Sequence, residues 1–151
     1  MAATHLLVGA GKMGGALLSG WLDSGVVVPR KLVILDPSPG PKAIYAIERG
    51  AKHIVKASDI PKSVQTVLLA IKPQLFKDIA PELAAALPPH ALIISILAGT
   101  SLRQLNQTFD GRLVIRAMPN SPAAIGAGIS AILVDPKLPE EKIQELSLIH
   151  I

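Results

Sequence analysis

Short runs of aliphatic residues alternate along the chain with segments whose apolar residues recur at helical spacing. The aliphatic runs predict buried strands at residues 4–8, 31–35, 53–56, 66–71, 91–96 and 113–117, with a seventh at 128–134. The amphipathic segments predict helices at residues 12–22, 42–49, 75–87 and 102–108, and another from residue 140 onward. Gly25 is expected to end the first helix and Ser101 to cap the fourth.

The β-α alternation predicts a Rossmann-type, doubly wound α/β fold, in which a mainly parallel sheet carries helices on both faces. Half of the residues are hydrophobic but only 3% are aromatic, so the core must be aliphatic. An aliphatic core is typical of parallel strands that are covered on both sides. No linker or repeat divides the chain, and we expect one NAD(P)-binding domain over residues 1–147.

Composition excludes several classes of function. The net charge of +4 comes from scattered cations, which does not favour a nucleic-acid surface. The absence of cysteine rules out disulfides and thiolate chemistry and fits the cytoplasm, where we expect the protein. The four histidines lack metal-ligand spacing, so we expect no metal and read each as a surface or strand-edge residue. No apolar run is long enough to span a membrane, and the N-terminus does not resemble a signal peptide.

The strongest local motif is G-A-G-K-M-G at residues 9–14, between a predicted strand and a predicted helix. Gly9 permits a tight turn, Gly11 lets a pyrophosphate approach the backbone, and Gly14 allows close packing of the helix on the sheet. The helix N-terminus then offers N–H groups to the phosphates. The motif predicts a dinucleotide site; the alternative is a glycine-rich turn without a ligand.

The second predicted strand ends at Asp36, where an acid typically accepts hydrogen bonds from the adenosine ribose and favours NAD. Ser38 and Lys42 lie nearby and could serve the 2′-phosphate of NADP, so the cofactor preference stays open. Asp36 could also simply initiate the turn before Pro37.

Three later strand ends also carry distinctive segments, at residues 70–73, 98–99 and 116–122. Ligands of open α/β sheets bind outside the carboxyl ends of the strands. We therefore expect all three segments to converge on one crevice above the glycine-rich turn, although each alone could be an ordinary turn.

Four segments of the chain are distinctive: V-G-A-G-K-M-G-G-A-L-L-S-G-W, L-A-I-K-P-Q, S-I-L-A-G-T and R-A-M-P-N-S-P. On these segments, the chain resembles the pyrroline-5-carboxylate reductase family over residues 4 to about 146. The resemblance implies reduction of 1-pyrroline-5-carboxylate to L-proline, the last step of proline biosynthesis, by hydride transfer from NADPH or NADH. It assigns no catalytic side chain, because a protonated imine is already an electrophile.

The resemblance also implies roles for individual residues. The cofactor would be bound by Gly9, Ala10, Gly11, Lys12, Met13, Gly14, Asp36, Ser38, Ala70, Ile71, Lys72, Pro73, Ala98 and Gly99. The substrate cavity would be edged by Met118, Pro119 and Asn120. Asp36 departs from several family members, which carry a neutral residue there, so the resemblance does not choose between NADPH and NADH.

The family has a C-terminal helical domain that forms the dimer and binds the substrate carboxylate, and we expect that domain to be absent here. The last helix runs into S-L-I-H-I, and residues 148–151 are expected to be a truncation end or a non-native tail. A homo-oligomer is accordingly expected only with the missing domain. The alternatives are a reductase of the hydroxyacid dehydrogenase type and a non-catalytic dinucleotide-sensing module.

Overall fold

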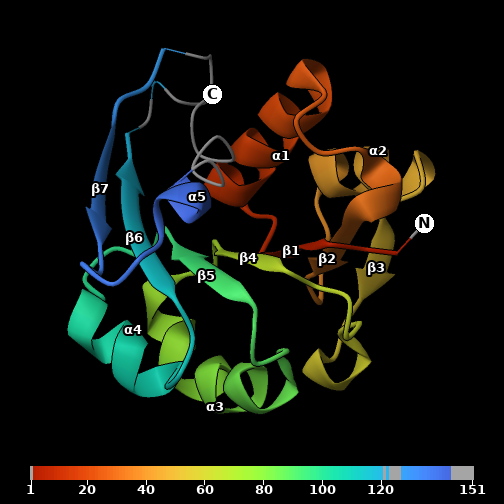
Figure 1. Cartoon of the computed structure of the whole chain (residues 1–151). Helices are drawn as coiled ribbons and strands as arrows, with labels where there is room; N and C mark the ends of the chain where they lie inside the picture. The colour runs from red at the N-terminus through yellow and green to blue at the C-terminus, as the bar shows by residue number, and fades with distance from the viewer. Residues whose placement is uncertain (1, 121, 123–126, 144–151) are drawn as a thin grey trace.

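The computed structural model describes residues 2–120, 122 and 127–143, which form one twisted sheet between two layers of helices (Figure 1). The strands are β1 (His5–Val8), β2 (Leu32–Leu35), β3 (Lys52–Ile54), β4 (Thr66–Leu69), β5 (Leu92–Ser95), β6 (Val114–Pro119) and β7 (Ser130–Val134). The helices are α1 (Lys12–Ser24), α2 (Pro41–Glu48), α3 (Phe76–Ala86), α4 (Leu102–Thr108) and α5 (Glu140–Ile143).

The strand order is β3-β2-β1-β4-β5-β6-β7, and every neighbouring pair is parallel except β6 and β7. This order confirms the Rossmann-type, mainly parallel sheet that the sequence predicts. After β1 the chain builds outward to β2 and β3, and it then returns to the other side of β1 with β4. The carboxyl end of β1 is therefore a topological switch point, the place where open α/β sheets bind ligands.

Successive residues of each central strand face opposite layers, and all are buried except His5 at the start of β1, which is half-buried. In β1, Leu6 and Val8 join the core under α3 and α4, whereas Leu7 joins the core under α1 and α2. Figure 1 shows these two helix pairs on opposite sides of the sheet. Since both faces are covered, β2, β4 and β5 are uniformly aliphatic runs with buried side chains, apart from small hydroxyl residues at two ends.

The predicted ends of the elements are correct to within a few residues. Gly25 ends α1 with a φ of +71°, as expected of a glycine C-cap. Ser101 caps α4, because its Oγ accepts the N–H of Gln104 over 3.2 Å and its own N–H donates to the Gln104 side chain over 2.9 Å. These local signals are short-range, which is why the sequence alone finds them.

The sixth strand is longer than predicted. We expected it to end at Ala117, with Met118 and Pro119 in the turn beyond it, but β6 continues to Pro119. The reason is the antiparallel partner β7, which returns along the edge and pairs Ala131 with Met118 and Ser130 with Pro119. These two residues are therefore part of the sheet, whereas the strand end expected at Ala117 is wrong.

The end of the chain is described only as far as α5, so our expectation for residues 148–151 lies outside the described residues. Within the described part, no helix is both long and apolar enough to cross a membrane.

Candidate dinucleotide site

A sharp turn at Gly9 brings together the ends of three strands. Gly9 has a φ of +86°, a conformation that residues with a side chain rarely adopt. Its N–H donates to Leu35 O at the end of β2 over 3.0 Å. A Cβ atom on Gly9 would lie 2.9 Å from Ala70 O and from Ile71 N, at the end of β4. The turn thus fills the switch point and leaves no room for a side chain at Gly9.

The other two glycines of the motif face opposite surroundings. Gly11 is exposed at the N-cap of α1, and a Cβ atom there would meet no heavy atom within 4 Å. Gly14 is buried, and a Cβ atom there would overlap the carbonyl oxygen of Gly9. Gly14 therefore allows α1 to pack against the turn, whereas Gly11 keeps the surface in front of the helix open.

The N-terminus of α1, with the partial positive charge of its helix dipole, faces this open surface. The first intrahelical bond runs from Gly15 N–H to Gly11 O over 2.8 Å, so the N–H groups of residues 12–14 lie before the helical ladder. The first turn carries no acidic residue, and Lys12 is exposed there. N–H groups ahead of the helical ladder, the helix dipole and a cation together suit a phosphate group.

The Asp36 carboxylate joins the glycine-rich turn to the loop after β2. Its Oδ2 accepts the N–H of Ala10 over 2.7 Å, and its Oδ1 accepts the N–H of Ser38 over 2.8 Å. The bond to Ser38 is the turn-initiating role that the sequence left open. Each carboxylate oxygen can accept more than one hydrogen bond, so this role does not prevent contact with a ligand.

A cavity of about 590 Å³ opens beside this turn, over the ends of β1, β2 and β4. Its walls are mainly aliphatic and include Leu35, Val55, Leu75 and Ile79. The predicted site residues that line it are Gly9, Gly11, Asp36, Ser38, Ala70, Ile71 and Lys72. The structure therefore places half of the predicted cofactor residues around one mostly apolar space with a polar edge.

A second cavity, of about 440 Å³, adjoins the first at Asp36. It shares Gly11, Asp36 and Ser38 with the first and adds Ala10 and Lys12 from the predicted set. Lys42, at the start of α2, also lines it. Two lysines and one carboxylate therefore surround this space, a charge balance that suits a phosphate more than a second carboxylate.

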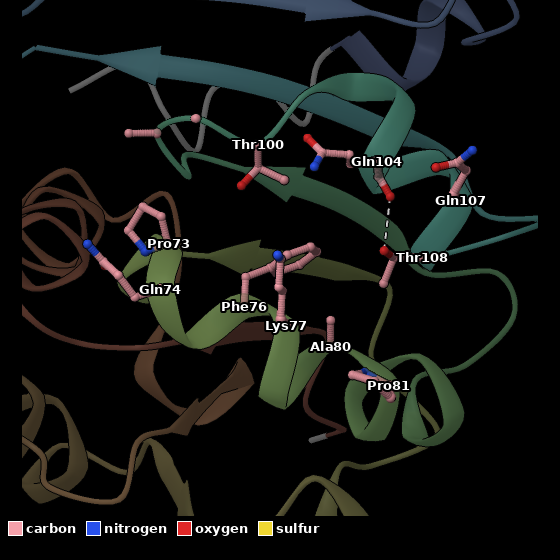
Figure 2. Close-up of a pocket in the computed structure, with 12 residues that line it drawn as sticks. Pro73, Gln74, Phe76, Lys77, Ala80, Pro81, Thr100, Gln104, Gln107 and Thr108 are labelled. Atoms are coloured by element: carbon pink, nitrogen blue, oxygen red, sulfur yellow. Dashed lines mark hydrogen bonds between the residues drawn. The ribbon is translucent and has the colours of Figure 1, made fainter.

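A third cavity, of about 760 Å³, lies between α3 and α4. Pro73, Ala98 and Gly99 line it, so the segments that follow β4 and β5 both reach this cavity. Figure 2 shows side chains of α3 and α4 on its two sides, with Thr100 on the loop that leads into α4. The polar members that the sequence analysis missed are Gln74, Lys77, Thr100, Gln104, Gln107 and Thr108.

Other predicted residues line none of these three cavities. Met13 packs on the core beneath α1, and Gly14 is buried. Met118 and Pro119 lie within β6, and Asn120 follows it. Asn120 uses its Oδ1 to accept the N–H of Ile129 over 2.9 Å. The segments at residues 70–73 and 98–99 thus line cavities along one edge of the sheet, whereas among the described residues Met118, Pro119 and Asn120 line none of the three.

Among the described residues, no group of three or more histidine or acidic side chains is placed to hold a metal ion.

Comparisons with known proteins match this architecture. Residues 6–99 match the model of the family described as NADP oxidoreductase coenzyme F420-dependent. The chain is 32% identical over 126 residues to pyrroline-5-carboxylate reductase of Escherichia coli K12, covering 83% of this chain and 47% of that protein. It is 36% identical over 126 residues to that of Thermus thermophilus, covering 83% and 46% respectively. The chain thus spans about half the length of these curated relatives.

A solved structure of pyrroline carboxylate reductase from Plasmodium falciparum, with NADP bound, superposes with a TM-score of 0.82. The two sequences are 18% identical, and the match covers 98% of this chain and 54% of that one. At this identity the likeness establishes a shared fold.

We predict that Gly14→Ala destabilises the protein, whereas Gly11→Ser does not. The added methyl at Gly14 overlaps a backbone carbonyl, and such overpacking costs about 1–3 kcal/mol of the free energy of unfolding. A serine side chain at position 11 enters open space at an N-cap, where serine is favoured, and the change should stay within about 0.5 kcal/mol. Urea denaturation measures both, and equal losses in the two variants would contradict this division of roles.

Proposed function

The chain belongs to the family of NADP oxidoreductases described as coenzyme F420-dependent, and from this we propose that it binds NADPH or NADH along the carboxyl edge of its sheet. The observation that carries the proposal is the open surface at Gly11, directly in front of the N-terminus of α1. A pyrophosphate there would receive N–H groups from the helix and approach the backbone without meeting a side chain.

The two ends of the cofactor then extend in opposite directions. Asp36 and Ser38 would contact the adenosine ribose, and the aliphatic cavity beside them suits an adenine ring. Lys42 lines the adjoining cavity, where its ammonium group could pair with a 2′-phosphate. Residues 70–73 would follow the other half of the cofactor toward Ala98 and Gly99, where we place the nicotinamide.

We further propose that the complete enzyme reduces 1-pyrroline-5-carboxylate to L-proline. Support comes from the relatives that carry this name and from the resemblance of the I-K-P-Q and R-A-M-P-N-S-P segments to that family. The dinucleotide would supply the hydride, which adds to the imine carbon while the nitrogen keeps its proton. The protein's part is to bind and orient the two reactants.

The 151 residues correspond to about half of those relatives, so we propose that the substrate contacts come mainly from their other half. Met118, Pro119 and Asn120 would form only one edge of the substrate cavity. Holding donor and acceptor carbons in contact can contribute roughly 7–11 kcal/mol to lowering a barrier. A domain that binds the donor alone forgoes most of that contribution.

We predict that Gly11→Val weakens NADPH binding at least tenfold, about 1.4 kcal/mol, because its side chain occupies the pyrophosphate position. The protein itself leaves room for this side chain, so the fold should persist. Fluorescence titration measures the affinity, and circular dichroism monitors the fold. Unchanged affinity in a folded variant would rule out a pyrophosphate at Gly11.

We predict that Asp36→Asn shifts the ratio of affinities toward NADPH by about fivefold. Asparagine keeps an oxygen for one backbone N–H, but it removes a negative charge, whose effect at this half-buried position is about 1 kcal/mol. Parallel titrations with NADPH and NADH measure the ratio. If both affinities change equally, Asp36 serves only the turn.

We predict that the 151-residue chain oxidises NADPH with pyrroline-5-carboxylate at least a hundredfold more slowly than a protein that also carries the remaining half of a relative. The loss of substrate positioning sets this expectation. Absorbance at 340 nm follows the reaction, with a β-hydroxyacid and NADP⁺ as the comparison substrates. Turnover of the hydroxyacid instead would favour a hydroxyacid dehydrogenase, and comparable rates for the two proteins would show that this domain holds a complete site.

A further inference from the structure

His53, a side chain without a role in the proposed function, contacts the main chain of Asp36. It lies on β3, in register with Ile34 of β2, and it is half-buried. Its Nε2 atom lies 2.8 Å from Asp36 O. A carbonyl oxygen can only accept a hydrogen bond, so Nε2 must carry the proton and donate. The carbonyl acceptor at Asp36 therefore fixes the tautomer of the His53 ring.

The contact occurs where the β2–β3 ladder ends. The N–H of Asp36 still reaches Ile54 O, at 3.3 Å, but β3 ends at Ile54 and the chain turns away. The imidazole of His53 therefore takes the place of the next main-chain donor and satisfies the Asp36 carbonyl.

All four hydrogen-bonding groups of Asp36 are thereby engaged with different parts of the fold. Its N–H and C=O are held by β3, through Ile54 and His53. Its two carboxylate oxygens hold the N–H groups of Ala10 and Ser38. Because the main chain of a residue sets the direction of its Cα–Cβ bond, a turn of the peptide after Asp36 would displace the carboxylate. The glycine-rich turn and the loop after β2 would then lose their shared anchor.

We propose that His53 is a positioning residue of the dinucleotide site, acting through Asp36 on the adenosine end of the ligand. This rests on the proposed function. The imidazole fixes the Asp36 peptide, and the fixed carboxylate sets the distance between Ala10 and Ser38. That distance determines how the ribose and its 2′-substituent fit between the two loops. His53 itself lines neither of the two cavities that Asp36 lines, so it acts without touching the ligand.

The test compares His53→Phe, which keeps a ring but has no donor, with His53→Gln, whose amide nitrogen can replace Nε2. ADP-ribose and NADPH are the probes, and titration calorimetry measures their affinities. One lost hydrogen bond predicts a threefold to tenfold weaker affinity in His53→Phe for both probes. His53→Gln should stay within twofold of the wild type. His90→Phe is the matched control, because His90 is exposed in the loop before β5, and it should leave both affinities unchanged.

A ligand-free measurement separates this proposal from the proposed function. Amide hydrogen exchange at Ala10 and Ser38 reports the Asp36 anchor directly, and it should accelerate at least threefold in His53→Phe and recover in His53→Gln. If the wild type binds neither probe, the proposed function is wrong, and exchange alone decides the role of His53. If His53→Phe does not fold, His53→Asn, whose shorter amide cannot reach Asp36 O, replaces it. Wild-type affinity and exchange in the donor-less variant, or equal losses in His53→Phe and His53→Gln, would overturn the proposal.

Discussion

The close approach of the Gly9 turn to the end of β4 is the constraint on which the rest of the site depends. β1 lies between β2 and β4, so the chain that leaves it must turn within the space that the ends of both neighbours leave. The backbone meets this limit with a positive φ at Gly9 and with no Cβ atom at Gly14, which would overlap the Gly9 carbonyl. As a result, α1 starts directly above the sheet edge, and its N-terminal N–H groups face the surface that Gly11 leaves open.

A second level of order comes from Asp36, which ties this turn to the next loop. Its carboxylate binds one N–H from each side, so the negative charge is partly offset before any ligand arrives. Lys12 and Lys42 add two cations around the smaller of the two cavities that Asp36 lines. This balance explains why an acid at the end of β2 need not exclude a 2′-phosphate. In our proposal, discrimination between NADPH and NADH depends on the balance of these charges rather than on Asp36 alone.

Much of the fold could be predicted from the sequence because its signals are local. The aliphatic runs gave the strands, Gly25 and Ser101 marked helix ends through short-range geometry, and the motif at residues 9–14 gave the glycine-rich turn. The predicted end of β6 was wrong because the true end depends on pairing with β7, which is separated from β6 in sequence. The cavity between α3 and α4 was missed because Lys77 and Gln107, taken singly, look like ordinary surface residues of two helices. Likewise, His53 belongs to no recognisable motif, and only the parallel pairing of β2 with β3 places its side chain next to Asp36.

The central claim is that a dinucleotide lies along the carboxyl edge of this sheet, with its pyrophosphate at the N-terminus of α1. Amide chemical-shift mapping during titration with NADPH tests it most directly, because it locates the ligand residue by residue. We expect the largest shifts at residues 11–14, with further shifts at Ser38 and at Ala98 and Gly99. Shifts confined to the amino-terminal edge of the sheet, or the absence of shifts at residues 11–14 with saturating ligand, would contradict the claim.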